Sequence, residues 1–212
     1  MQTDQIKLNS TENDIAQALE EAERFSAYSG LTGKSAIHVR LLTEEALGMV
    51  RGILGDNPAQ FWLESVKKGK KRLCRICITV QTDVNPNRRQ ELLDMSSSGR
   101  NAAAVGIVGK IRNIIELGMQ GYDEAARFQG DYGVVAANYA VMGMVYPDAS
   151  LDAFYWSLDT YREQASKLEN KREAEKVWDE LEKSVVSKLA DEVRVGIRRS
   201  KVELVVEKQM DA

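Results

Sequence analysis

Residues that could bind a ligand fall in three short stretches between positions 35 and 110. The first is a helix predicted over about 35–54, in which Glu45 stands close to Gly48 and Gly52. Since a glycine inside a helix costs about 1 kcal/mol relative to alanine, the pair indicates a smooth surface that something approaches closely. That neighbour is either a packed strand or helix, or a ligand beside the carboxylate. Helical spacing is expected to place on this one face His38, Leu41, Glu45, Gly48, Met49 and Gly52.

The second stretch is a polar, glycine-containing loop over 96–101 that opens a helix predicted over about 102–117. Free backbone N–H groups at the start of a helix attract anions such as phosphate. The side chains of Arg100 and Lys110 would add positive charge. The candidate binding residues of this loop are Ser98, Gly99, Arg100 and Asn101.

This second stretch is not a P-loop. Ala104 stands where the first glycine of that motif belongs, and Ile111 stands where Ser or Thr belongs. Small residues at Ala102, Gly106 and Gly109 form a stripe that would let the helix lie tightly on a sheet. A capped, closely packed helix with no ligand is therefore the alternative interpretation.

The third stretch is the end of a strand predicted over about 72–83. Asp83 is followed by Asn85, Pro86 and Asn87, and asparagine tolerates left-handed backbone angles. The segment is either a turn that contacts a ligand or a plain Asn-Pro turn.

The two cysteines, Cys74 and Cys77, lie within an apolar segment over 73–80 that is typical of a strand. Three-residue spacing on a strand puts the side chains on opposite faces. The chain has no second pair of Cys or His residues to complete a zinc site. The sequence therefore predicts buried structural thiols.

The elements that must position these residues form an α+β pattern. We expect a mostly antiparallel sheet with helices on one face, plus an extra helical element near the C-terminus. Within that element, a helix that Asp148–Ser150 caps is expected to bury a stripe of Leu151, Phe154, Tyr155, Leu158, Tyr161, Ala165 and Leu168. A further helix carries Ala174, Val177, Trp178, Leu181 and Val185, and the two form either a hairpin broken near Asn170 or one long helix. The remaining elements are helices over about 11–29 and 35–54, strands over 59–65 and 72–83, and a final hairpin of strands 193–197 and 202–206.

The bulk composition limits the function classes. A length of 212 residues suits one domain, and the net charge of −3 offers no basic excess for nucleic acid. No stretch of about 18 apolar residues predicts a membrane span. The polar N-terminus lacks the apolar run of a signal peptide, and two cysteines without a disulfide framework favour a cytoplasmic protein.

The order of these elements resembles the ATP-binding fold of histidine kinases, gyrase-type ATPases and anti-sigma-factor kinases, known as the Bergerat fold. The segment 41–49 is similar to the helix that carries a Glu and, four residues later, a magnesium-binding Asn. Residues 80–87 are similar to the strand and turn in which an Asp contacts adenine, and 106–116 to the helix after the ATP lid. The resemblance implies Glu45 as general base and a nucleotide site of Glu45, Gly48, Met49, Asp83, Asn85, Ser98, Gly99, Arg100, Asn101, Gly106 and Lys110.

The chain departs from that family's pattern at the site itself. Met49 replaces the magnesium-binding Asn, and Asn85 and Asn87 replace two glycines of the turn. We therefore expect a degenerate regulatory module that binds ATP or ADP without relying on Mg²⁺ and acts through a protein partner. The alternatives are a protein-interaction domain without nucleotide binding and an active kinase of the anti-sigma-factor type.

The expected organisation is one domain over 1–212. It would contain a helical insertion over about 122–189, which the family does not predict, and a C-terminal hairpin over about 192–208. A homodimer is compatible with this organisation, and neither a nucleic acid nor a membrane is expected as a partner.

Overall fold

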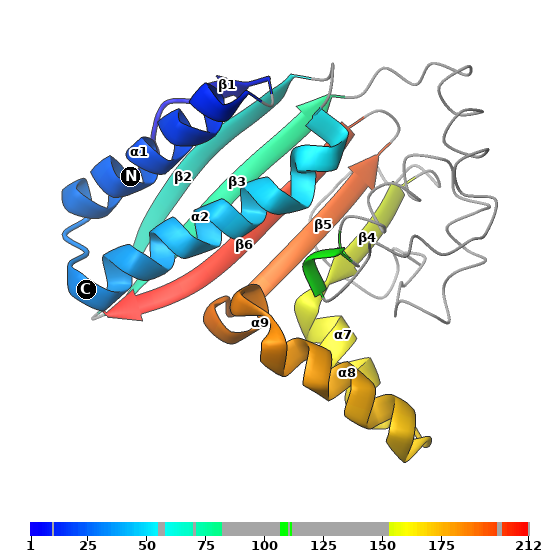
Figure 1. Ribbon diagram of the computed structural model, residues 1–212. Coiled ribbons are helices and arrows are strands. Elements are labelled where there is room, and N and C mark those ends of the chain that lie inside the picture. The colour runs from blue at the N-terminus through cyan, green and yellow to red at the C-terminus, as the bar shows by residue number, and fades with distance from the viewer. Residues whose placement is uncertain are drawn as a thin grey trace, which may run out of the picture.

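The computed structural model describes residues 1–9, 11–54, 58–69, 71–81, 107–109, 111, 153–198 and 201–211. These residues form a six-stranded sheet with helices on one face (Figure 1). The elements are β1 (Ile6–Leu8), α1 (Glu12–Tyr28), α2 (Gly33–Leu54), β2 (Ala59–Lys68), β3 (Lys71–Gln81), β4 (Ala153–Ser157), α7 (Leu158–Lys167), α8 (Lys171–Lys183), α9 (Val185–Leu189), β5 (Glu192–Arg198) and β6 (Lys201–Asp211).

The strand order in the sheet is β1-β2-β3-β6-β5-β4, and all neighbouring strands pair antiparallel. The predicted α+β class with an antiparallel sheet is thereby confirmed. The two alternating segments near the C-terminus form the hairpin β5–β6, and β6 also pairs with β3 along its whole length. The last strand of the sequence therefore lies in the middle of the sheet.

Alternation along the strands separates the two faces of the sheet. In β3, Ile76, Ile78 and Val80 are buried beneath the helices, whereas Arg75 and Thr79 point to the other face and are partly exposed. Phe61 and Leu63 of β2 continue the same buried layer. The core therefore lies between this face and the helices.

Helices α1 and α2 cover the buried face (Figure 1). Thr11 begins α1 with a capping box: its Oγ1 accepts from the backbone N–H of Asp14 at 3.1 Å, and the Asp14 carboxylate accepts from the Thr11 N–H at 3.3 Å. A break with positive φ at Gly30 and Gly33 separates the helices, as the sequence predicts.

The helix predicted to begin after Asp148–Ser150 is wrong for the residues just before position 158. Ala153–Ser157 forms the edge strand β4, and α7 begins only at Leu158, with Ser157 Oγ accepting from the Thr160 N–H at 3.1 Å. Three consecutive aromatics, Phe154-Tyr155-Trp156, favour a strand, and Trp156 is buried opposite Val195 of β5. The insertion expected to be helical thus adds a strand to the sheet.

Helices α7 and α8 form a bent arm that projects from one end of the sheet (Figure 1). Asn170 separates them, because its Oδ1 caps α8 by accepting from the Arg172 N–H at 3.1 Å. Leu158, Tyr161 and Ala165 of the predicted stripe are buried. Leu168 is not, since it follows the last residue of α7 and is 40% exposed.

Candidate functional site

Helix α2 carries the part of the predicted site that the structure describes. Glu45 lies at the edge of the buried face and Gly48 is partly exposed. Among the described residues, no atom lies within 4 Å of a Cβ built at Gly48. No described element therefore packs closely enough against this position to require a glycine.

Met49 does not lie on the same exposed face of α2 as Glu45 and Gly48, so this part of the prediction is wrong. It is fully buried in the apolar core, together with Ile107 and Ile111. A helix turns about 100° per residue, so Met49 is rotated about 40° from Glu45 toward buried Ala46, whereas Gly48 is rotated about 60° the other way. The boundary between core and surface therefore runs between Met49 on one side and Glu45 and Gly48 on the other, although helical spacing groups the three together.

The other predicted site residues lie outside the described residues. They are Asp83, Asn85, Ser98, Gly99, Arg100, Asn101, Gly106 and Lys110. The structure does place the last residue of β3 at Gln81, shortly before Asp83 in the sequence. The convergence of Glu45, Asp83 and the loop over 98–101 stays a prediction.

Two titratable side chains of α2, Glu45 and His38, lie in surroundings that favour their uncharged forms. Burial, and then the neighbouring Glu44, raises the pKa of the Glu45 carboxyl above its usual value. Burial lowers the pKa of His38, and the positive charges of Lys34 and Lys208 lower it further. Among the described residues, none forms a hydrogen bond or ion pair with the Glu45 carboxylate. Glu45 could therefore hold a proton more readily than a solvated glutamate.

The cysteines are free, buried thiols on opposite faces of β3, which confirms the prediction for them. Cys74 lies opposite Ser65 of β2, and Cys77 lies opposite Trp62. Burial raises the pKa of Cys74 to about 11 and that of Cys77 to about 12. Neither thiol is therefore a nucleophile at neutral pH.

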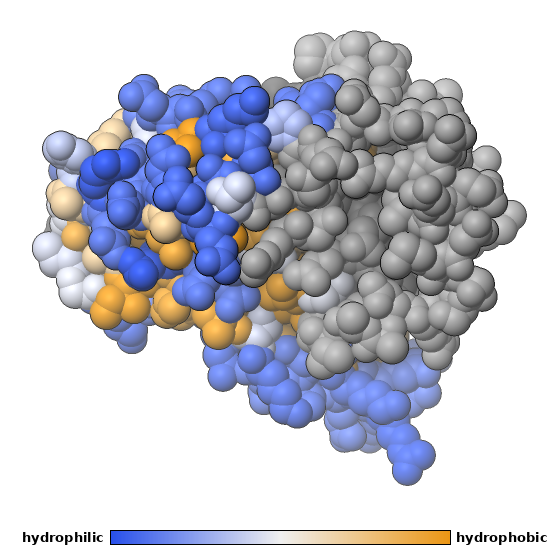
Figure 2. All heavy atoms as spheres, turned by 45° about the horizontal axis from the view of Figure 1, so that its top comes forward, coloured by the Kyte–Doolittle hydropathy of each residue, from blue (hydrophilic) through white to orange (hydrophobic). Residues whose placement is uncertain are grey.

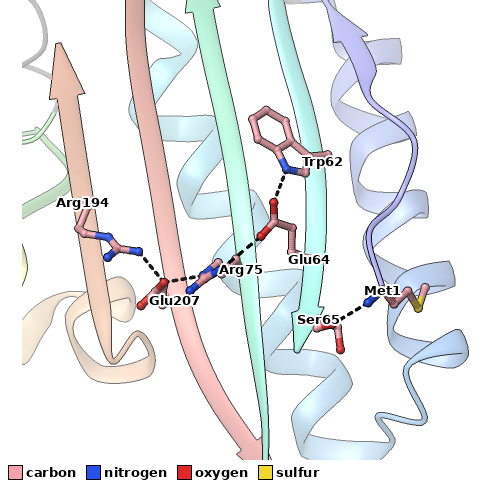
Figure 3. Close-up of polar contacts among 7 residues, drawn as sticks. All are labelled: Met1, Trp62, Glu64, Ser65, Arg75, Arg194 and Glu207. Atoms are coloured by element: carbon pink, nitrogen blue, oxygen red, sulfur yellow. Dashed lines mark hydrogen bonds and ion pairs between the residues drawn. The ribbon is translucent and has the colours of Figure 1, made fainter. Parts of the chain in front are cut away.

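A chain of polar contacts crosses the sheet on the face opposite α1 and α2 (Figure 3). The Trp62 indole N–H donates to Glu64 at 2.9 Å, and Arg75 lies 3.5 Å from the other oxygen of that carboxylate. Arg75 also donates to Glu207 at 2.6 Å, and Arg194 donates to the same Glu207 oxygen. Sequence reasoning missed this ladder, since its members become neighbours only once the register of β2, β3, β6 and β5 is known.

The projecting helix α8 carries a second feature that the sequence left unassigned. A shallow hollow on its surface is lined by Lys171, Ala174, Glu175, Trp178, Asp179 and Glu182. Trp178 is 40% exposed there. The arm that projects at the bottom of Figure 2 is hydrophilic over the surface shown, so this tryptophan stands among polar neighbours.

Within the described ranges, no group of three or more His, Cys, Asp or Glu residues could hold a metal ion. No helix in the described part is long and apolar enough to cross a membrane. Comparison of the chain with protein-family models, curated proteins and solved structures found no match.

Proposed function

We propose that this protein is a regulatory module of the histidine-kinase ATPase type that acts through a protein partner and has no magnesium-dependent ATP chemistry. The observation that carries the proposal is the position of Met49. A buried thioether in an apolar cluster stands where the resemblance requires a magnesium ligand. Magnesium binds oxygen ligands and keeps several waters, and neither is compatible with that environment.

The architecture supports the family part of the proposal. A two-layer arrangement with α2 lying across an antiparallel sheet, and buried Ile107 and Ile111 joining the same core, is what the resemblance implies. The helix after the predicted loop would then lie on the same side of the sheet as α2.

A second candidate function, magnesium-independent binding of ATP or ADP, is favoured by the position of Glu45 at the edge of the buried face of α2. The carboxylate of Glu45 would repel phosphate oxygens if it were ionised, and its raised pKa weakens that repulsion. Binding of this kind is expected to be weak, because no metal ion neutralises the phosphates.

Titration calorimetry with ATP and ADP, with and without Mg²⁺, tests both candidates. We expect either no heat or weak binding that Mg²⁺ does not strengthen. Tight binding that strictly requires Mg²⁺ would contradict the proposed function.

Two substitutions at one position test whether any observed binding uses the α2 surface. Gly48→Leu should abolish it by placing a large side chain beside Glu45, whereas Gly48→Ala, whose Cβ meets no described atom within 4 Å, should leave it unchanged. Both substitutions raise helix propensity, so unfolding of α2 would not explain a loss.

A further inference from the structure

The outward side of α2 carries a short row of exposed side chains. They are Lys34, Ile37, Leu41 and Glu44, here called the α2 ridge. Their spacing of three, four and three residues places them on one side of the helix, and it is the spacing by which one helix packs along another. Ile37 is 57% exposed and Leu41 is 36% exposed, although α2 packs on the sheet and against α1 (Figure 1). The ridge is therefore a second, outward face on a helix that buries its other face in the core.

The two ends of the α2 ridge carry opposite charges. Lys34 lies at the N-terminal end and Glu44 at the C-terminal end, with the two apolar side chains between them. Within the described residues, neither Lys34 nor Glu44 has an ion-pair partner. Glu45 lies next to Glu44 and brings no positive charge to that end. The ridge thus runs from a positive end through an apolar centre to a negative end.

The charged groups beside the ridge leave this polarity in place. Arg40 forms an ion pair with Glu23 of α1, so its charge is compensated. Lys208 of β6 pairs with Asp191 at 2.6 Å. Burial, and then the neighbouring lysines, lower the pKa of His38, which favours the neutral imidazole at pH 7. The uncompensated charges of this side of α2 are therefore those at the ends of the ridge.

We infer that two copies of this chain associate through their α2 ridges, with the two α2 helices antiparallel about a two-fold axis. In a two-fold interface the same surface of both copies meets, so a contact of one residue with another is made twice. Positions 37 and 41 are centred on position 39, and so are positions 34 and 44. An axis at that point places Ile37 against Leu41 of the second copy and Lys34 against Glu44 of the second copy. The ridge is therefore complementary to itself in both charge and apolar character.

The order of the charges selects this occupant and this orientation. Parallel α2 helices would place Lys34 against Lys34 and Glu44 against Glu44, and like charges that face each other across an interface repel. A uniformly basic or uniformly acidic helix of another protein would be attracted to one end of the ridge and repelled by the other. Antiparallel pairing of two copies is attractive at both ends. The inference concerns a second copy of the chain and does not rest on the proposed function.

Sedimentation equilibrium of the full-length protein without nucleotide tests the inference. Two apolar side chains per copy make a small contact, so we expect a weak, reversible dimer with a Kd of about 10–100 µM. Ile37→Ala/Leu41→Ala should weaken the dimer by at least about tenfold, since it removes the apolar centre. Leu168→Ala truncates another apolar side chain that is 40% exposed, and it should have no effect. Melting curves by circular dichroism show that each variant is folded.

Charge reversal distinguishes antiparallel pairing from general adhesion. Lys34→Glu and Glu44→Lys should each weaken self-association by about tenfold, since each replaces two attractive pairs in the dimer by two repulsive ones. An equimolar mixture of the two variants should recover the dimer. In the mixed dimer one copy has carboxylates at positions 34 and 44 and the other has ammonium groups at both, so both pairs between the copies are attractive.

Lys171→Glu and Glu182→Lys on α8 are the matched controls, because they change the net charge equally at exposed positions away from the ridge. Neither control should alter self-association, alone or mixed. A wild type that stays monomeric up to about 500 µM would overturn the inference and leave the ridge to a helix of another protein. Self-association that is indifferent to the ridge substitutions, or that does not recover in the mixture, would also overturn it. No nucleotide is present, so the calorimetry with ATP and ADP judges the proposed function separately.

Discussion

The substitution Glu207→Gln should destabilise the protein more than any other single carboxylate-to-amide change on the sheet. Glu207 lies on the central strand β6 and accepts from both Arg75 and Arg194 (Figure 3). Its side chain is 14% exposed, whereas those of Arg75 and Arg194 are 34% and 27% exposed. Removing the negative charge leaves Arg194 without the carboxylate that it contacts among the described residues, and leaves Arg75 with its longer contact to Glu64.

The magnitude follows from the number of bonds and their exposure to water. Each hydrogen bond to a charged group contributes about 1.5–3 kcal/mol where water is excluded. Partial exposure of both arginines reduces this, because exposed ion pairs contribute about 0–1 kcal/mol. We therefore expect the free energy of unfolding to fall by about 2 kcal/mol, which lowers the melting temperature by about 4–8 °C in a chain of this size.

Urea unfolding followed by circular dichroism measures this loss, and Glu203→Gln is the control. Glu203 lies on the same strand and the same face, but its one ion-pair partner among the described residues is Lys201, and the side chains of both are more exposed. Its substitution should cost less than about 0.5 kcal/mol. Equal effects of the two substitutions would refute the reasoning, since the ladder would then contribute no more than one surface ion pair.

Three further predictions concern the core and α2. Glu45→Gln should stabilise the protein at pH 7: burial raises the pKa of this carboxyl, so the wild type loses stability as the pH rises through the raised pKa, and its difference from the variant should disappear below the unfolded pKa in urea titrations. Cys74 and Cys77 should not react with a thiol reagent in the folded protein and should both react in urea; rapid reaction of either under native conditions would contradict their burial. Met49→Asn should lower the free energy of unfolding by about 3 kcal/mol, whereas Met49→Leu should cost less than about 1.5 kcal/mol; an Asn variant as stable as the wild type would show that this position is not in the core.

Local periodicity predicted the elements whose neighbours are close in sequence. The alternation of β2, β3, β5 and β6 and the apolar spacing of α1 and α2 are strong local signals, and these elements form where they were expected. The break at Gly30 and Gly33 was readable because the backbone there needs positive φ.

Features that depend on distant partners could not be read in the same way. The aromatics of β4 favour a strand, but the apolar spacing of this segment also suits a helix, and pairing with the edge of β5 decides between the two. The position of Met49 depends on where the core boundary crosses α2, which a spacing rule places only to within part of a turn. The remaining members of the candidate site stay predictions.

The central position of β6 ties the completion of the fold to synthesis of the C-terminal region. Arg75 and Glu207 are in contact across 132 positions of sequence, so the loop between β3 and β6 must close before these strands gain their pairing energy. While a ribosome is still making Lys201–Asp211, β3 and β5 both expose unpaired edges. Such edges are templates for pairing with other chains. In a nascent chain these two edges stay unpaired until β6 has been made and has paired between β3 and β5.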